Sequence, residues 1–575
     1  MRNPLRFVMA SAMALVVGSS LLLSGTAFAD TIKAEQAQPM TNIVKGATLK
    51  PVQAGPLRIP TITWGGDVVA PLAESEGLFK AEGLNVQLFH QDDFVQQVRG
   101  VINGETPFLR GTFGMINAAS EAMHNAGTDL VVLDQITWSH GGDRLVVRPG
   151  IKSLADLKGK KIALQLDGPH MDLLTTVLAS ANLSLSDVHI VWLKELSVPS
   201  YDTKGQIVDA RTAFQSDASI DAAFVISPDA DVLTSNGAGG NGSEGSVRGA
   251  KVLFSSASAS RVIADVWAVR ADWFNTHQDD ARKFVHAIML SEEHLTTLIN
   301  NKGTQKQKWN DLLKSSSKLL ENSPSDVEGL LGDCEFVDFA GNVAFFTGNG
   351  TTRNLTVMKD EIQPAFVTLG VMKGQAPVLS ANFDYTKLAA GLSNANLAAI
   401  PAPKFDANKV QAAVEGQIAS EPTKWDEEGS LYMFEIYFVP NQASFTASQY
   451  ATSFQKIMEL SQTFGGAIIT IEGHNAPDLL QKAKASGNTA LASQIEQAAK
   501  NLSLKRAQAV RQAYIDYAKS KHIAVDESQF IAVGMGATHP KFAVPATKEE
   551  WQSNMRVVFR LKNVETEAES FQPGK

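Results

Sequence analysis

Apolar runs of strand length alternate with amphipathic helical segments from Leu57 to about Leu392. The run LRIPTITW at 57–64 predicts a strand, and APLAESEGLFKAEGL at 70–84 predicts an amphipathic helix that ends at Gly83. Further apolar runs of strand length follow, with helical segments among them: NVQLFHQ, DLVVLDQITW, DRLVVRPG, KKIALQL, VHIVWLKEL, DAAFVI and RGAKVLFSS. This alternation predicts α/β units with mostly parallel sheets.

The strand period is lost between 396 and 429, where Pro, Ala, Lys and acidic residues mix, and we expect a linker with one short helix there. From 430 the alternation returns in LYMFEIYFVP, AIITIEGH, FIAVGMG and MRVVFRL, and SLKRAQAVRQAYIDYAKSKHI has helical spacing. The pattern therefore predicts a small α+β sandwich domain over 430–563. The polar residues 564–575 are expected to be a disordered tail.

The N-terminus has the pattern of an export signal. Two arginines precede an apolar run from Phe7 to Leu23, and Ala27-Phe28-Ala29 has the small-x-small form of a cleavage site. The alternative is a membrane anchor, but the run of about 17 residues is at the short limit for a span. We expect a signal peptide over 1–29, cleaved near Ala29, and a flexible leader over 30–55.

Charge and cysteine content narrow the function further. The formal net charge is −9, and it becomes −11 once the two arginines of the signal are removed. That balance gives no electrostatic footprint for nucleic acid or anionic lipid. Cys334 is the single cysteine, so we expect no internal disulfide and no lipid anchor at a cysteine beside the cleavage site.

Two stretches resemble periplasmic substrate-binding proteins of ABC importers, in the group that binds sulfonates, nitrate, taurine and pyrimidine precursors. They are TWGGDVVAPLAESEGLFKAEGLNV at 63–86 and DQITWSHGGDRLVVRPGIKSLADLKGKKIALQLDGPHMDLLTTVL at 134–178. The Asp-Leu-Lys-Gly-Lys step in the second stretch is common to many such binders. The resemblance implies a type II, two-lobed α/β fold over 56–395, a small-molecule ligand in the cleft and an importer permease as partner.

Ligands of open α/β sheets sit beyond the carboxyl ends of the strands, where helix N-termini present free N–H groups. Glycines there let the backbone approach a ligand, the tryptophans either wall the cleft or pack in the core, and each Asp either contacts the ligand or caps a helix. The excess of carboxylates favours a zwitterionic, amine-bearing or neutral heterocyclic ligand, with an anion held by helix termini still open. The candidate cleft residues are Trp64, Gly65, Gly66, Asp67, Thr112, Trp138, Ser139, His140, Asp143, Asp167, His170 and Asp229.

Enzyme activity is not expected. Some relatives of the group make a pyrimidine with a His and a cysteine-rich motif, whereas this chain has only Cys334 and no nucleophile elbow. The histidines of the first domain show no close metal-ligand spacing. We therefore predict no catalytic residue, no metal and no cofactor.

The second domain resembles the OmpA-like domain, which binds the diaminopimelate stem of peptidoglycan. IYFVPNQASF, IEGHNA, LSLKRAQAV, VGMGATHP and NMRVVF match that family's motifs in order. In the family, an Asp after Gly-His-Thr holds the ammonium of diaminopimelate, and the Arg of Leu-Ser-x-x-Arg-Ala holds its carboxylate. The resemblance implies attachment to the cell wall.

The residues of this second site depart from the family at one position. Arg506 is in place and can form a two-pronged pair with a carboxylate. Ala476 stands where the family has its Asp, and Asp478 either replaces that Asp or caps the following helix. Arg556 is either a second cation for the ligand or an exposed strand residue. The candidate peptidoglycan-binding residues are His474, Asn475, Asp478, Arg506 and Arg556.

Together these features predict a periplasmic solute-binding protein that serves an ABC importer and is tethered to peptidoglycan. One alternative is an envelope sensory or scaffold protein that uses its binding lobes for signalling. A less favoured alternative is an enzyme like the pyrimidine-precursor synthases.

Overall fold

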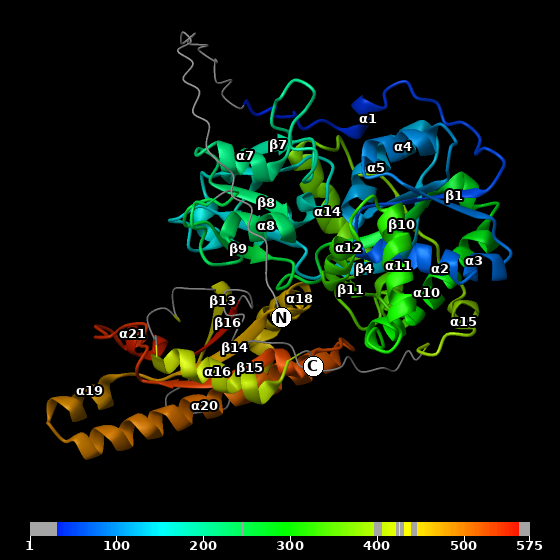
Figure 1. Ribbon diagram of the computed structural model, residues 1–575. Coiled ribbons are helices and arrows are strands. Elements are labelled where there is room, and N and C mark those ends of the chain that lie inside the picture. The colour runs from blue at the N-terminus through cyan, green and yellow to red at the C-terminus, as the bar shows by residue number, and fades with distance from the viewer. Residues whose placement is uncertain are drawn as a thin grey trace, which may run out of the picture.

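The computed structural model describes residues 31–243, 245–395, 405–420, 425, 430–438 and 445–562. The predicted signal peptide, half of the predicted linker and the predicted tail lie outside these ranges. Two α/β lobes lie side by side, and a C-terminal domain coloured yellow to red lies beneath them (Figure 1). Within the described ranges, no helix is long and apolar enough to cross a membrane.

Lobe 1 is built from two separate parts of the chain, with β11-β4-β10-β3 as the strand order of its larger sheet, β12 beside β4, and β1 paired with β2. The first part comprises β1 (Leu57–Thr61), η1 (Gly65–Val68), α2 (Val69–Ser75), α3 (Leu78–Ala81), β2 (Val86–His90), α4 (Phe94–Ile102), β3 (Phe108–Thr112), α5 (Phe113–Ala126) and β4 (Leu130–Ser139). The second part comprises β10 (Ala264–Arg270), α9 (Ala271–Phe274), α10 (Gln278–Asn300), α11 (Lys306–Leu319), α12 (Pro324–Gly332), β11 (Cys334–Phe336), α13 (Phe339–Thr347), α14 (Leu355–Leu369), β12 (Val378–Ser380) and α15 (Tyr385–Leu388).

Lobe 2 is a continuous insertion with the strand order β7-β6-β8-β5-β9. Its elements are β5 (Asp143–Val147), η2 (Leu154–Leu157), β6 (Lys161–Gln165), α6 (His170–Ser180), η3 (Leu185–Asp187), β7 (His189–Leu193), α7 (Ala210–Ser216), β8 (Ala222–Ile226), α8 (Ser227–Thr234) and β9 (Lys251–Ser255). Two short segments connect the lobes. We call 140–142, between β4 and β5, the first crossover, and 256–263, between β9 and β10, the second crossover.

The sheets are mixed, which corrects the prediction of mostly parallel sheets. β10 runs antiparallel to β3 and β4, and β5 runs antiparallel to β8 and β9. The parallel pairs are β1 with β2, β6 with β7 and β8, and β12 with β4. Two reversed strands, β5 and β10, follow a crossover, where the chain enters a lobe from the opposite side. A third, β11, also runs antiparallel to β4. An apolar run does not encode its direction, so the periodicity could not reveal this.

The segment predicted as a flexible leader differs from that prediction where it is described. Lys33 and Glu35 donate backbone hydrogen bonds to Ile207 and Trp192 in lobe 2. Met40, in α1 (Met40–Ile43), is 1% exposed and packs in the core near α5. The physical reason is that a free strand edge and an apolar side chain both find partners on the lobes, which a polar composition does not reveal.

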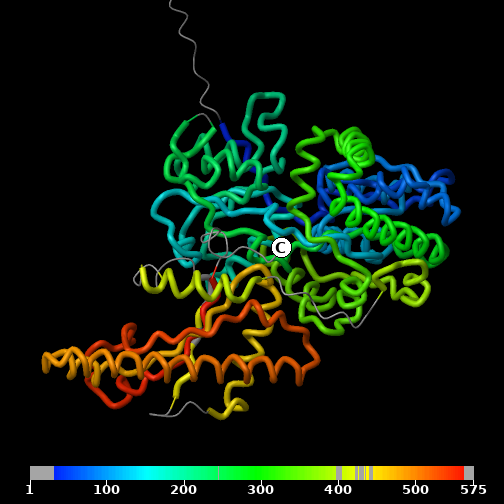
Figure 2. The backbone as a smooth tube through the Cα atoms, turned by 60° about the horizontal axis from the view of Figure 1, so that its bottom comes forward, coloured from blue at the N-terminus to red at the C-terminus, as the bar shows by residue number. Residues whose placement is uncertain are grey.

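The C-terminal domain has one four-stranded sheet in the order β13-β16-β14-β15, with helices α18 and α20 on one face. Figure 2 shows this domain again on one side of the two lobes. A hairpin of α19 and the first part of α20 projects from it in Figure 1. Its elements are β13 (Ser430–Tyr437), η4 (Ala447–Tyr450), α18 (Ala451–Thr463), β14 (Ile468–His474), α19 (Asp478–Ala485), α20 (Thr489–Ser520), η5 (Glu527–Gln529), β15 (Phe530–Gly536), α21 (Lys548–Ser553) and β16 (Arg556–Lys562).

Part of the predicted linker is structured and covers the other face of this sheet. It forms α16 (Ala407–Ser420), whose Val410 and Val414 are buried in one cluster with residues of β14 and β15. Trp425 is also buried there, and its Nε1 donates to Glu472 Oε1 at 2.8 Å. The described part of the linker therefore belongs to the fold of the C-terminal domain and is more than a spacer.

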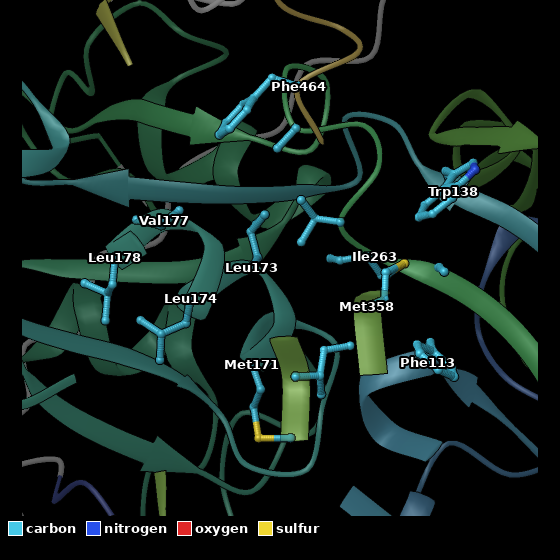
Figure 3. Packing of buried hydrophobic residues seen from close by; sticks show 14 of the residues in the cluster. Phe113, Trp138, Met171, Leu173, Leu174, Val177, Leu178, Ile263, Met358 and Phe464 are labelled. Carbon is cyan, nitrogen blue, oxygen red and sulfur yellow. The ribbon is translucent and has the colours of Figure 1, made fainter. Parts of the chain in front are cut away.

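One buried apolar cluster continues through both lobes and into the C-terminal domain. It includes Phe113 of lobe 1, Leu173 of lobe 2, Ile263 of the second crossover, Met358 of α14 and Phe464 of the C-terminal domain. Figure 3 shows these side chains as members of the one cluster, with Phe464 and Phe113 toward opposite sides of it. The three bodies therefore share a core in this arrangement.

Glycines allow α20 to lie directly on the C-terminal sheet. A Cβ at Gly473 in β14 would lie 1.9 Å from the carbonyl oxygen of Ser503, and one at Gly534 in β15 would lie 2.5 Å from that of Lys500. Both acceptors belong to the backbone of α20, so neither can move aside alone. The family-like Gly residues of these strands are therefore packing residues.

We expect Gly473→Ala to lower the local free energy of opening of β14 by about 1–3 kcal/mol, because the added methyl overpacks the contact between strand and helix. Hydrogen–deuterium exchange of amides in β14 and β15 measures this free energy. Gly416→Ala is the matched control, since a Cβ there has no atom within 4 Å. Equal exchange in β14 for both variants would contradict the packing role.

Candidate functional site

The lobes meet where helices begin, and the start of α5 receives a carboxylate from lobe 2. Thr112 caps α5, with its Oγ1 accepting from the N–H of Met115 at 3.2 Å. The N–H of Gly114 donates to Asp172 Oδ2 of α6 at 3.3 Å. A Cβ at Gly114 would lie 1.6 Å from Asp172 Oδ1, so only glycine permits this approach. Helix starts carry unpaired N–H groups and a partial positive charge, which favour an anionic partner.

The start of α8 has a similar partner from lobe 1. Ser227 begins α8, and its Oγ donates to Asp333 Oδ2 at 2.7 Å. Asp333 lies between α12 and β11, and its carbonyl oxygen accepts from the N–H of His140 in the first crossover at 2.8 Å. Each lobe thus presents a helix start to an aspartate of the other lobe, which defines the cleft as a polar and closed interface.

A buried guanidinium organises the lobe 1 side of the cleft. Arg110, at 0% exposure, donates to Asp67 Oδ2 at 2.8 Å and to Asp265 Oδ1 at 3.0 Å. Thr137 Oγ1 donates to Asp265 Oδ2 at 2.9 Å and accepts from Trp64 Nε1 at 3.0 Å. Burial raises the pKa of Asp67 to about 6, although Arg110 opposes the shift.

The two predicted tryptophans have different positions. The ring of Trp64 reaches the first crossover, where a Cβ at Gly142 would lie 2.7 Å from it. Gly65 and Gly66 allow the backbone beside Trp64 to pack closely against its neighbours. A Cβ at Gly65 would lie 2.3 Å from the carbonyl oxygen of Leu330. Trp138 is 6% exposed and packs in the core against Phe345. Trp64 therefore borders the cleft and Trp138 does not.

Lobe 2 contributes a second buried set of polar groups. His170, the first residue of α6, is fully buried against Phe224, and its Nε2 lies 2.9 Å from Asp143 Oδ1. Asp143 Oδ2 accepts from Ser139 Oγ at 2.6 Å. Asp229 is 3% exposed, and its Oδ1 lies 3.2 Å from Nη1 of Arg211 in α7. These groups line the cleft side of α6 and α8.

Two aspartates near the interface between the lobes each have one buried carboxylate oxygen without a hydrogen-bond partner in the described part of the chain. Among the residues that the structure describes, Asp172 Oδ1 and Asp229 Oδ2 are buried without a hydrogen-bond partner. Burial raises the pKa of Asp172 to about 7, and burial together with Asp93 across the cleft raises the pKa of Asp167 to about 7. Buried acceptors of this kind favour a ligand that donates hydrogen bonds.

The structure brings together most predicted cleft residues, and it adds others. The lobe 1 side of the cleft contains Trp64, Gly65, Gly66, Asp67 and Thr112. The lobe 2 side contains Ser139, Asp143, His170 and Asp229. Asp167 begins the turn before α6 with a φ of 58°. Sequence reasoning missed Thr137, Asp172, Asp265 and Asp333, because each lies inside a regular element or far along the chain with no local loop signal.

The C-terminal site is centred on Arg506 of α20. This residue is fully buried, and burial lowers the pKa of its guanidinium to about 10. Its Nη1 donates to Asn475 Oδ1 at 2.6 Å and to the carbonyl oxygen of His474 at 3.3 Å. The ring of Phe438 lies 5.3 Å from the guanidinium carbon. Arg506 stays positively charged at neutral pH and meets the predicted residues His474 and Asn475.

Asp478 lies at the start of α19, where its Oδ1 accepts from Trp551 Nε1 at 2.9 Å. No side-chain cap bond is formed at this helix start. Asn475, in turn, is held by its Nδ2, which donates to the carbonyl oxygen of Ala499 at 2.7 Å. Asp478 therefore contacts α21, whereas Asn475 is hydrogen-bonded to Arg506.

The remaining two predicted residues of this site are buried. Arg556 Nε lies 3.0 Å from Glu435 Oε1, and Glu435 also pairs with Lys541. His474 is 1% exposed, and its burial holds the pKa of its imidazole well below its usual range. His474 is therefore neutral at physiological pH. Across the described residues, no group of three or more His, Cys, Asp or Glu side chains could hold a metal ion.

We expect the stability contributed by Asp172 to depend on pH. Its raised pKa means that the folded protein holds a proton that the unfolded chain releases, so stability falls as pH rises from about 4 to about 7. Asp172→Asn removes this loss, and its melting temperature relative to wild type should increase between pH 5 and pH 8. Asp187→Asn, at a partly exposed group whose pKa is about 2, is the control and should show no such trend. Parallel curves for all three proteins would refute the assignment.

Two family models match the chain. Residues 69–296 match the NMT1/THI5-like family, and residues 437–554 match the OmpA family. A protein of Brucella abortus strain 2308 that is named as a binding protein is 30% identical over 156 residues, which is 26% of this chain and 46% of that protein. The chain thus spans about half the length of the curated relatives it matches.

Solved structures of similar fold include binding proteins and an enzyme. The periplasmic aliphatic sulphonate-binding protein SsuA from Escherichia coli is 15% identical, with a TM-score of 0.40 over 56% of this chain and 90% of that one. The desulfurization enzyme DszB is 14% identical, with a TM-score of 0.35 over 59% of this chain and 96% of that one. A likeness at this level does not separate binders from enzymes. The chain therefore matches the NMT1/THI5-like family in its first part and the OmpA family in its last part.

Proposed function

We propose that this chain is a periplasmic solute-binding protein that delivers a small molecule to an ABC importer and is held at the cell wall by its OmpA-family domain. The observation that carries the proposal is the interface between the lobes. There, buried polar groups and helix starts from both lobes face one another and bury their charges together. Burying charged groups at an interface of this kind costs free energy, because their mutual attraction rarely offsets the lost hydration in full. Binding of a ligand by these groups would explain why the interface is kept.

The ligand we propose donates hydrogen bonds, as an amine, an amino acid or an amino-substituted heterocycle does. The unpartnered oxygens of Asp172 and Asp229 support this class, since both are acceptors when ionised. The helix starts at Gly114 and Ser227 would take a negatively charged group of the same ligand once Asp172 and Asp333 move aside. A zwitterion satisfies both requirements.

Two features support binding over catalysis. Burial raises the pKa of the Cys334 thiol well above its usual range, which keeps it protonated and poorly nucleophilic. His170 is fully buried beside Asp143, with no serine or cysteine nucleophile bonded to it among the described residues. The relatives that match the chain are also named as binding proteins.

A thermal-shift screen tests the ligand class. We expect amino acids, diamines or aminopyrimidines to raise the melting temperature more than nitrate or ethanesulfonate, which carry no N–H donor. A ligand at 100 Kd adds about 2.7 kcal/mol of stability, which such a screen detects. For the solute found, Asp229→Asn should weaken binding about tenfold or more, because a buried acceptor for an N–H donor is lost.

Asp311→Asn is the control for this screen, since Asp311 is exposed on α11 and its carboxylate contacts Gln307 on the same helix. It should bind the solute as wild type does. A response to nitrate or ethanesulfonate alone, or an unchanged affinity in Asp229→Asn, would refute the proposed ligand class.

Sedimentation with isolated peptidoglycan sacculi tests the wall attachment. The full chain should co-sediment, and Arg506→Gln should reduce the bound fraction at least tenfold, because the carboxylate of the stem peptide loses its charged partner. Gln keeps a donor for Asn475, so the fold of the site is retained.

Lys505→Ala is the matched control, since Lys505 is the exposed neighbour of Arg506 on the same helix. Asp478→Asn then asks whether this carboxylate holds the ammonium of the stem. Retention of Arg506→Gln on sacculi would count against a family-like site. Loss of binding in Lys505→Ala would point to general charge attraction.

A further inference from the structure

The C-terminal domain reaches the hinge of the binding domain through one loop. We give the name clamp loop to residues 462–467, which comprise the last two residues of α18 and the segment before β14. The N–H of Gly466 donates to the carbonyl oxygen of Ser258 at 3.2 Å, and the N–H of Arg261 donates to that of Thr463 at 3.2 Å. Ser258 and Arg261 belong to the second crossover, so the loop pairs with the segment about which the lobes would rotate.

Gly466 makes this approach sterically possible. A Cβ at this position would lie 1.7 Å from the carbonyl oxygen of Ala257 in the second crossover. The neighbouring Gly465 has Ser260 Oγ at 3.1 Å from its own Cβ position. The two backbones are therefore in direct contact, without side chains between them.

The same loop contacts lobe 2. Phe464 is 1% exposed, and its ring meets that of Phe254 in β9 edge-on at 6.0 Å between centroids. Figure 3 shows Phe464 at the edge of the cluster that contains Leu173 and Val177 of α6. A buried phenylalanine at this position ties the C-terminal domain to the lobe 2 core.

The other end of the contact lies on lobe 1. Gln462 Oε1 accepts from Thr351 Oγ1 at 2.8 Å and from the N–H of Thr352 at 2.7 Å. The N–H of Ala524, which follows α20, donates to the carbonyl oxygen of Gly350 at 3.2 Å. Thr351 and Thr352 lie between α13 and α14 of lobe 1. The C-terminal domain therefore contacts both lobes and the crossover that joins them.

The contacting surface is fixed within its own domain. Gln529 Nε2 donates to the carbonyl oxygen of Phe464 at 2.8 Å and to that of Ser461 at 3.3 Å. Gln462 Nε2 donates to the carbonyl oxygen of Ala524 at 2.9 Å. The clamp loop and the end of α20 thus form one rigid surface. A rotation of one lobe relative to the other has to break or displace one of its contacts.

We propose that the C-terminal domain is a clamp on the hinge, which holds the two lobes in the closed arrangement while it is docked. Opening of the cleft then requires the clamp loop to leave Phe254 or Thr351 and Thr352. Because coupling between two sites is reciprocal, any partner that draws the C-terminal domain off the hinge favours an open cleft, and a ligand that favours the closed cleft favours docking. This inference does not depend on the identity of the solute or on attachment to peptidoglycan.

Distance measurement between the lobes tests the clamp on the full chain without any ligand. Spin labels are placed at Lys80→Cys in lobe 1 and Lys152→Cys in lobe 2, both exposed, in a Cys334→Ala background. The chain with its native clamp loop should give one narrow distance. Gly466→Ala, which places a methyl against the crossover, and Gln462→Ala, which removes the acceptor for Thr351 and Thr352, should each give a broader distribution with a longer component.

Hydrogen–deuterium exchange of the same proteins reports docking. The amides of Arg261, Thr352 and Ala524 should exchange at least tenfold faster in Gly466→Ala. Gly374→Ala is the control, since a Cβ there has no atom within 4 Å, and it should match the native loop in both measurements. Unchanged amide protection in Gly466→Ala would overturn the docked arrangement. Faster exchange with an unchanged lobe distance would overturn the clamp, whatever the outcome with sacculi or solutes.

Discussion

The buried charge of Arg110 is the constraint on which the cleft depends. Its guanidinium has no contact with water and is balanced by Asp67 and Asp265. Removing one partner of a buried pair of this kind typically costs about 3–5 kcal/mol, because the remaining charge is left without compensation. Arg110 comes from β3, Asp67 from η1 and Asp265 from β10. These two ion pairs therefore fix three elements that are far apart in sequence. The same elements carry Trp64, Thr112 and the end of the second crossover.

The cleft built on this constraint is closed by the protein's own carboxylates. Asp172 approaches the start of α5, and Asp333 approaches the start of α8, each from the opposite lobe. An anionic group of a ligand would make the same kind of contact with a helix start. The carboxylates of Asp172 and Asp333 therefore hold the lobes together at positions that a solute could occupy instead. The unpartnered oxygens of Asp172 and Asp229 can accept hydrogen bonds from that solute. Both features are the grounds on which we propose a zwitterionic solute rather than a simple anion.

The C-terminal domain has two relations to the rest of the chain. Its sheet is covered on one face by α16 and Trp425, and its clamp loop lies on the hinge of the two lobes. It is therefore built into the molecule rather than carried on a free spacer. The residues of its proposed peptidoglycan site also depart from the OmpA-family pattern, because Asn475 contacts Arg506 and Ala476 stands where that pattern has Asp. A domain that keeps the family's arginine but docks on a hinge can combine attachment with control of the cleft.

The sequence alone determined the two domains, most of their strands and helices, and the two families. These properties follow from local periodicity and from motifs of neighbouring residues, such as the glycines of β14 and β15 and the Leu-Ser-x-x-Arg-Ala segment of α20. Of the candidate cleft residues, those in glycine-rich loops, such as Trp64 and Asp67, could be named because a loop after a strand points to the cleft.

Only the tertiary structure decided which distant groups meet. The pairing of Arg110 with Asp265, the approach of Asp172 to Gly114 and the contact of Gly466 with Ala257 join segments that share no local pattern. Strand direction, the burial of Trp138 and the packing of the leader were decided in the same way. The reason is physical: periodicity records which face of an element is apolar, whereas the choice of partner depends on the free energy of burying charges and backbones together across the whole fold.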